Sequence, residues 1–150
     1  MKLRRIKKMK TLDFYTADTH SSLELPFAGD VSAGFPSPAE DFMDMSLDLN
    51  RELIKDPNAT FYARVKGNSM QNIGVEDGDV LVIDRSLEPV NDAVAVCFID
   101  GEFTVKRLHV KKDICYLLPE NEAYEPIPVD EDNNFIIWGI VTYVIKKMKP

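Results

Sequence analysis

Ser69 and Lys106 are the two residues whose types and settings could together carry covalent chemistry. Ser69 follows Gly67 and Asn68 at the end of a predicted strand, and this turn-prone lead-in lets its hydroxyl protrude. A serine hydroxyl becomes a good nucleophile only when a base removes its proton. Backbone N–H groups of Ser69 and Met70 could stabilise the oxyanion formed by attack on a carbonyl. Losing one such donor typically costs about 100- to 1,000-fold in rate. Taken alone, this serine also fits an ordinary structural turn.

Lysine is a better candidate base for this serine than histidine. The two histidines are His20, in the N-terminal segment, and His109, just past Lys106 beside a charged stretch. Neither has an obvious acidic partner, so a Ser-His-Asp triad fits poorly. A lysine can serve as the base if its amine is neutral near pH 7. Its pKa must then be lowered by about 3 from the reference value of about 10.4, which costs about 4 kcal/mol. Burial among apolar side chains favours the neutral amine. Lys106 is the best candidate because it lies mid-strand opposite the apolar run 93–99, although most strand lysines face water.

The elements that must position these residues are mostly β-strands. Apolar runs of strand length, rich in β-branched residues, follow one another from residue 60 onward. Asp100-Gly101 is a strong two-residue turn signal, so the runs on either side of it are predicted to form a hairpin. Helical spacing of apolar residues predicts one short helix over 48–55. The expected strands cover residues 61–66, 79–84, 93–99, 102–108, 116–118 and 135–145.

Residues 1–45 read as an extended and weakly organised arm. They show no helical stripe, and glycine, proline and serine gather between residues 29 and 38. Pro36 and Pro38 favour extended conformations in the residues that precede them. The arm is too short and too irregular for a helix-turn-helix domain.

Charge and composition exclude several classes of protein. The net charge is −7, and because residues 1–10 carry six positive charges, the remainder carries −13. So acidic a body disfavours direct binding to duplex DNA. No apolar run is long enough to span a membrane or to form a secretory signal, so we expect a cytoplasmic protein. Cys97 and Cys115 have neither the spacing of a metal site nor that of a disulfide framework, and Cys97 is expected to be a small buried hydrophobe. No cofactor or metal is expected.

Read jointly, these segments resemble the S24 peptidases, the family of LexA-type repressors and UmuD-type mutagenesis proteins. The resemblance covers nearly everything from Ser32 to Lys147. It implies a mainly β fold, with a LexA/UmuD-like peptidase domain of twisted sheets and hairpins over 34–150. An extended N-terminal arm, residues 1–33, would be removed by self-cleavage. The matching motifs, in order, are Gly67-Asn-Ser-Met70, Gly74-Val-Glu-Asp-Gly-Asp-Val-Leu-Val-Ile-Asp84, Asp100-Gly-Glu-Phe-Thr-Val-Lys-Arg-Leu108, Leu118-Pro-Glu-Asn-Glu-Ala-Tyr-Glu-Pro-Ile127 and Gly139-Ile-Val141.

The resemblance also implies roles for particular residues. Ser69 corresponds to the family's nucleophile, and Lys106, in Thr-Val-Lys-Arg, to its general base. The family cuts itself between a small residue and a glycine in the arm, which Ala33-Gly34 matches. Alanine is small enough for a tight cleft and glycine accepts unusual backbone angles. The segment Phe35-Pro-Ser-Pro-Ala-Glu-Asp41 and the absence of a DNA-binding domain favour the UmuD branch. An ordinary flexible loop remains the alternative at the Ala33-Gly34 position.

The resemblance implies partners that the residues themselves do not reveal. They are a second copy in a homodimer, a recombinase filament on single-stranded DNA that activates cleavage, and an error-prone Y-family polymerase subunit that the trimmed protein joins in the SOS response to DNA damage. Three alternatives are a non-enzymatic polymerase-binding module, a truncated LexA-type repressor and a signal-peptidase relative. The repressor would need about sixty residues of helix-turn-helix before the cleavage site, and the signal peptidase would need a membrane anchor.

Overall fold

A computed structural model of the chain describes residues 2–8, 12–19, 24–27, 45–67, 73–118, 125–129 and 135–149. Within these ranges the fold is antiparallel β, with one short helix, α1 (Leu49–Leu53). The main sheet has the order β1-β2-β5-β6-β11-β7-β8-β9-β10, and β3 (Glu24–Phe27) pairs with β4 (Met45–Asp48) in a separate two-stranded sheet. The main-sheet strands are β1 (Lys2–Lys8), β2 (Leu12–Asp18), β5 (Thr60–Val65), β6 (Val80–Asp84), β7 (Val94–Ile99), β8 (Glu102–Lys111), β9 (Ile114–Leu117), β10 (Ile127–Pro128) and β11 (Phe135–Ile145).

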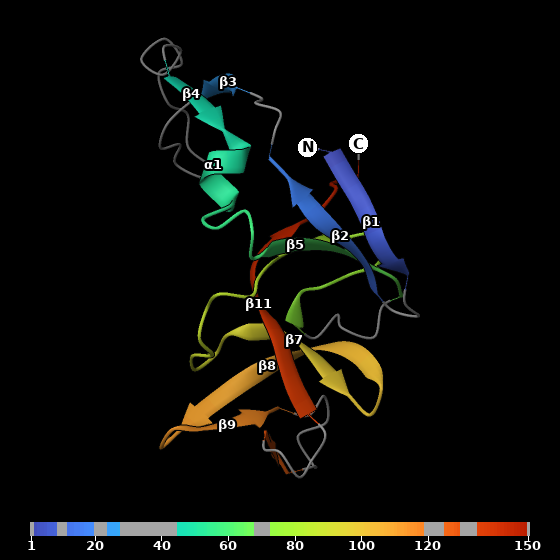
Figure 1. Cartoon of the computed structure of the whole chain (residues 1–150), viewed down its shortest axis with the longest axis vertical. Helices are drawn as coiled ribbons and strands as arrows, with labels where there is room; N and C mark the ends of the chain where they lie inside the picture. The colour runs from blue at the N-terminus through green and yellow to red at the C-terminus, as the bar shows by residue number, and fades with distance from the viewer. Residues whose placement is uncertain are drawn as a thin grey trace.

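Strand β11 joins the two halves of the main sheet (Figure 1). Its first part pairs with β7 and its second part pairs with β6, so it runs between the β1-β2-β5 group and the β7-β8-β9 group. The register against β7 shifts between Ile137 and Gly139. A Cβ atom at Gly139 would lie 2.5 Å from Cγ2 of the buried Ile83. Glycine is therefore required at this point because β6 approaches the β11 backbone so closely.

The largest apolar core lies between the two halves. Its buried residues come from β2, β5, β6, β7 and β8 and, at Val75, from the turn before β6, so no single hairpin supplies it. A second cluster covers the opposite face of the β7-β8 hairpin and includes Cys97 and Leu108. Cys97 is fully buried, and burial raises the pKa of its thiol to about 12. The expectation that Cys97 behaves as a buried hydrophobe is confirmed.

The expected strands and helix are found with small differences at their ends. The hairpin around Asp100-Gly101 is confirmed, and both turn residues have positive φ, 49° and 83°, as a two-residue turn of this kind requires. The helix is shorter than expected. It begins after Asp48, whose carboxylate accepts the Asn50 N–H. No helix in the described ranges is long and apolar enough to cross a membrane.

The described parts of the N-terminal segment, β1, β2 and β3, are extended, as expected, but the expectation of weak organisation is wrong for β2. This strand pairs with β5 from Leu12 opposite Val65 to Thr16 opposite Phe61. The side chains of Leu12 and Phe14 are 0% and 2% exposed and belong to the main core. The signal in the sequence was the partial alternation of apolar and polar residues in Leu12-Asp-Phe-Tyr-Thr-Ala17. Because both faces of β2 are covered, this alternation is not strict.

Candidate active site

Among the sequence-predicted site residues, the structure describes Lys106. The expected nucleophile Ser69 and its neighbour Met70 lie outside the described residues, as do Ala33 and Gly34 of the expected cleavage site. The geometry of the site is therefore built from Lys106 and from the strand end that leads to Ser69.

Lys106 lies in the middle of β8, directly opposite Ala95 of β7. Its face of the hairpin also carries Leu108, and Cys97 lies diagonally across on β7, so its near neighbours are the apolar residues of the second cluster. Its side chain is half-buried. The positive charge of Lys106 lowers the pKa of the Cys97 thiol, although burial, the largest effect, and Cys115 raise it more. Lys106 is therefore a half-buried side chain on an apolar face of the β7-β8 hairpin.

His109 is placed less favourably for base catalysis. It lies three residues beyond Lys106 on β8 and pairs in register with Tyr116 of β9. The two ring centroids are 6.3 Å apart. An aromatic ring does not orient an imidazole as the carboxylate of a catalytic triad does. His20 lies outside the described residues.

The strand end that leads to Ser69 is held by the turn over residues 75–79. Val65 donates its N–H to the Asp79 carbonyl at 2.9 Å, and Gly78 donates to the Val65 carbonyl at 2.9 Å. The Gly67 N–H donates to Oδ1 of Asp77 at 2.7 Å. Gly67 has φ +83°, a conformation that glycine adopts without strain. The backbone direction two residues before Ser69 is therefore fixed by a glycine and by a carboxylate.

Asp79 anchors the same turn to the end of the chain. Its side chain is buried, and Oδ2 accepts the Glu76 N–H at 2.8 Å and the Lys146 Nζ at 2.6 Å. Lys146 also contacts Glu76 at 3.1 Å. Sequence reasoning missed the roles of Asp77 and Asp79. The signal was present in Glu76-Asp-Gly-Asp79, since aspartates around a glycine are typical of turns held by their own side chains.

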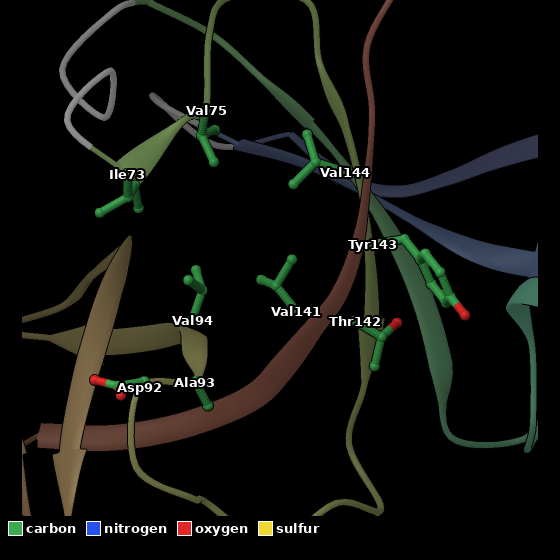
Figure 2. Close-up of a pocket in the computed structure, with 9 residues that line it drawn as sticks. All are labelled: Ile73, Val75, Asp92, Ala93, Val94, Val141, Thr142, Tyr143 and Val144. Atoms are coloured by element: carbon green, nitrogen blue, oxygen red, sulfur yellow. The ribbon is translucent and has the colours of Figure 1, made fainter. Parts of the chain in front are cut away.

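A pocket of about 290 Å³ opens next to the residues that follow the Ser69 segment. Figure 2 shows Val94, Val141 and Val144 pointing into a common space below Ile73 and Val75, while the Tyr143 ring points away from it. Its charged lining residue is Asp92, which has no second acid or base beside it in this lining. The pocket suits an apolar side chain. Its lining residues are Ile73, Val75, Asp92, Ala93, Val94, Val141, Thr142, Tyr143 and Val144.

Comparison with known proteins identifies the family. The model of the Peptidase S24-like family matches residues 26–142. The protein MucA of Salmonella typhimurium is 43% identical over 114 residues, which are 75% of this chain and 77% of MucA. ImpA of Salmonella typhimurium is 42% identical over 129 residues, covering 82% and 83% of the two chains. The chain belongs to the S24-like peptidase family. It is a self-cleaving serine peptidase of the UmuD type, the type that acts in SOS mutagenesis.

A LexA repressor is also similar to this chain, but the match covers a smaller share of the repressor's own length. The LexA repressor of Glaesserella parasuis is 41% identical over 123 residues, which are 81% of this chain but 58% of the repressor. The chain spans about four-fifths of MucA and ImpA and under three-fifths of this repressor.

The ion pair of Lys146 with Asp79 leads to a prediction about stability. Lys146 lies just outside the residues matched by the S24-like family model. The hydrogen bond to Asp79 is the main cause that raises the pKa of Lys146 above its ordinary 10.5; partial desolvation opposes it and Glu76 assists. The stabilising contribution of this ion pair is therefore present from neutral pH to about pH 10 and is lost as the pH rises through the raised pKa. We expect Lys146→Gln to lower the melting temperature at about pH 8, and the difference from the parent to shrink above about pH 11.

Scanning fluorimetry across this pH range measures both effects. Lys147→Gln, at the exposed neighbouring position, is the matched control and is expected to leave the melting temperature unchanged. Equal melting temperatures of parent and Lys146→Gln at about pH 8 would contradict the assigned anchor.

Proposed function

We propose that this protein cuts its own Ala33–Gly34 bond, with Ser69 as nucleophile, Lys106 as general base and the backbone N–H groups of Ser69 and Met70 as oxyanion donors. The observation that carries the proposal is the half-buried position of Lys106 on an apolar face of the β7-β8 hairpin. A chain of this peptidase family needs such a base, and His109 faces an aromatic partner instead.

The reaction runs as an acyl transfer within the chain. The neutral Lys106 amine takes the Ser69 proton while Oγ attacks the Ala33 carbonyl carbon. Backbone N–H groups hold the negative oxygen of the tetrahedral intermediate. When the bond to Gly34 breaks, the lysine ammonium returns a proton to the leaving amine. Water then hydrolyses the Ser69 ester. Residues 1–33 and residues 34–150 are then no longer joined by a covalent bond.

Tethering makes a modest catalyst sufficient, because the scissile bond and the nucleophile belong to one chain. Only a fraction of the molecules has the cleavage segment docked at the active site, and a partner that binds this docked state raises the fraction. For a UmuD-type protein we propose that this partner is a recombinase filament on single-stranded DNA. We also propose that the trimmed protein then serves as an accessory subunit of an error-prone Y-family polymerase in the cytoplasm.

We further propose that the chain works as a homodimer, and β11 supports this. Its residues from Tyr143 to Ile145 pair with β6 on one side, while its pairing with β7 ends at Val141. Tyr143 and Val144 there are 41% and 39% exposed. Among the described strands none pairs with the other side of β11 here, and apolar side chains along such a strand suit pairing with the same strand of a second copy.

Incubation at alkaline pH tests the cleavage reaction. A lysine base gains its neutral form as the pH rises, so we expect cleavage to accelerate between about pH 7 and about pH 10. Intact-mass spectrometry should then show two products, residues 1–33 and residues 34–150. The Asp79–Lys146 anchor remains intact in this range because the pKa of Lys146 is raised. A chain that stays whole throughout, while folded, would support the non-enzymatic polymerase-binding alternative instead.

A further inference from the structure

The N-terminal hairpin of β1 and β2 forms part of the main sheet. Strand β2 lies between β1 and β5, and Figure 1 shows the β1-β2 pair alongside β5. Leu12 and Phe14 enter the main core on one face of β2. Tyr15 and Ala17 pack on the other face against the cluster around Tyr62. Both faces of β2 are thus covered by the body of the protein.

Phe14 makes the most specific of these contacts. Its ring centroid lies 4.8 Å from that of Phe103 on β8 and 4.9 Å from that of Trp138 on β11, the second contact being edge-on. Such pairs contribute beyond simple area burial. One arm residue therefore contacts strands from the half of the sheet that carries Lys106.

An ion pair fixes the register of the same strand. Asp13, almost fully buried, lies with Oδ1 3.0 Å from Nζ of Lys66. Lys66 directly follows β5 and precedes Gly67, so the pair ties β2 to the strand end that leads toward Ser69. A one-residue slip of β2 would move Asp13 to the opposite face of the sheet and place Leu12 and Phe14 outside the core.

We propose that β2, with β1 paired to it, stays bound to β5 after the chain is cut, so that cleavage yields a noncovalent complex of two fragments. Cutting the Ala33–Gly34 bond removes the tether but none of the contacts made by Leu12, Asp13 and Phe14. Cleavage and release of the arm are then separate steps. The hairpin occupies the edge of β5 until something displaces it, and a partner that adds a strand to β5 has to compete with β2. The inference rests on the proposed function only for the position of the cut.

The test separates this inference from self-cleavage. A recognition site for a sequence-specific protease is inserted between residues 28 and 34 of the full chain carrying Ser69→Ala, so that the cut is made from outside. Native mass spectrometry and size exclusion at micromolar concentration then show whether the fragments stay together. Trp138 is the single tryptophan, and its fluorescence reports whether Phe14 still covers it.

The expected result is a single two-fragment species with unchanged Trp138 emission. In the same cut protein, Phe14→Ala should weaken the complex by about 100-fold or more, and emission should shift to the red as water reaches Trp138. Phe98→Ala is the matched control. Phe98 also contacts Phe103, at 5.0 Å, but lies on β7, so its loss alters the aromatic cluster without touching the arm.

Two outcomes would overturn the inference. One is separation of the fragments of the cut Ser69→Ala protein under native conditions with a red shift of Trp138. The other is a Phe14→Ala fragment that is retained as tightly as the parent, because the pairing of β3 with β4 would then hold the fragments together in place of β2 on β5. Failure of the proposed self-cleavage would show differently, as a wild-type chain that stays whole at alkaline pH, whatever the cut protein does.

Discussion

Ser69→Ala and Lys106→Ala should each slow formation of the fragment that starts at Gly34 by about 1,000-fold or more, since the proposed nucleophile and the proposed base would act as one unit. Lys106→Arg should be equally inactive, because a guanidinium keeps its proton at every pH that a folded protein tolerates. This third variant separates a base from a mere positive charge. The measurement is the rate of product formation by intact-mass spectrometry at several pH values.

Lys111→Ala is the matched control for the Lys106 variants. Lys111 lies five residues further along β8 and is exposed, so its loss should leave the rate and its rise with pH unchanged. Circular dichroism checks that each variant keeps its β fold. A Lys106→Ala protein that is folded and still accelerates with pH would show that another group removes the proton from the nucleophile.

Gly67→Ala is expected to slow cleavage by about 10- to 100-fold, which is the second largest effect. At φ +83° no atom of the described residues beyond the adjacent ones lies within 4 Å of a Cβ placed there, so the expected cost is that of the backbone conformation. Holding an L-residue in this region costs about 1–3 kcal/mol. The strand end can relieve this cost by turning away from Asp77, which would move Ser69, and a misplacement of about 1 Å is worth about 100-fold in rate. Asn tolerates this region better, so the rates should fall in the order Gly67, Asn, Ala, Val.

Gly101→Ala provides a control with the same backbone strain. Gly101 also has φ +83° with nothing within 4 Å of an added Cβ, but it lies in the β7-β8 turn. Both alanine variants should lose similar thermal stability in scanning fluorimetry, whereas only Gly67→Ala should lose most of its cleavage rate. Equal cleavage rates in the two variants would mean that Gly67 does not direct Ser69.

Local patterns in the sequence were sufficient for the strands of the body. The β7-β8 hairpin follows from two β-branched runs and from Asp100-Gly101, whose positive φ angles the turn demands. Strand β11 runs over Phe135–Ile145, the range that was predicted, because its apolar run is long and continuous. Such short-range signals arise from steric limits between neighbouring residues, so they can be read from the sequence without knowledge of the tertiary contacts.

The candidate site divides in the same way. The types Ser69 and Lys106 and the motifs around them come from the sequence, and family membership confirms the peptidase class. The half-buried setting of Lys106 depends on β7 lying opposite it. The bracing of Gly67 by Asp77 joins residues ten positions apart and depends on how the turn folds back.

What the sequence by itself determined is the β-rich body, the peptidase class and the residue types of the proposed dyad. What only the tertiary structure decided is the place of the arm: β2 is an internal strand, with Phe14 against Phe103 and Trp138. The reason is physical. A strand with both faces buried shows no strict alternation, and its choice of β5 depends on core side chains that lie about fifty or more residues away along the chain.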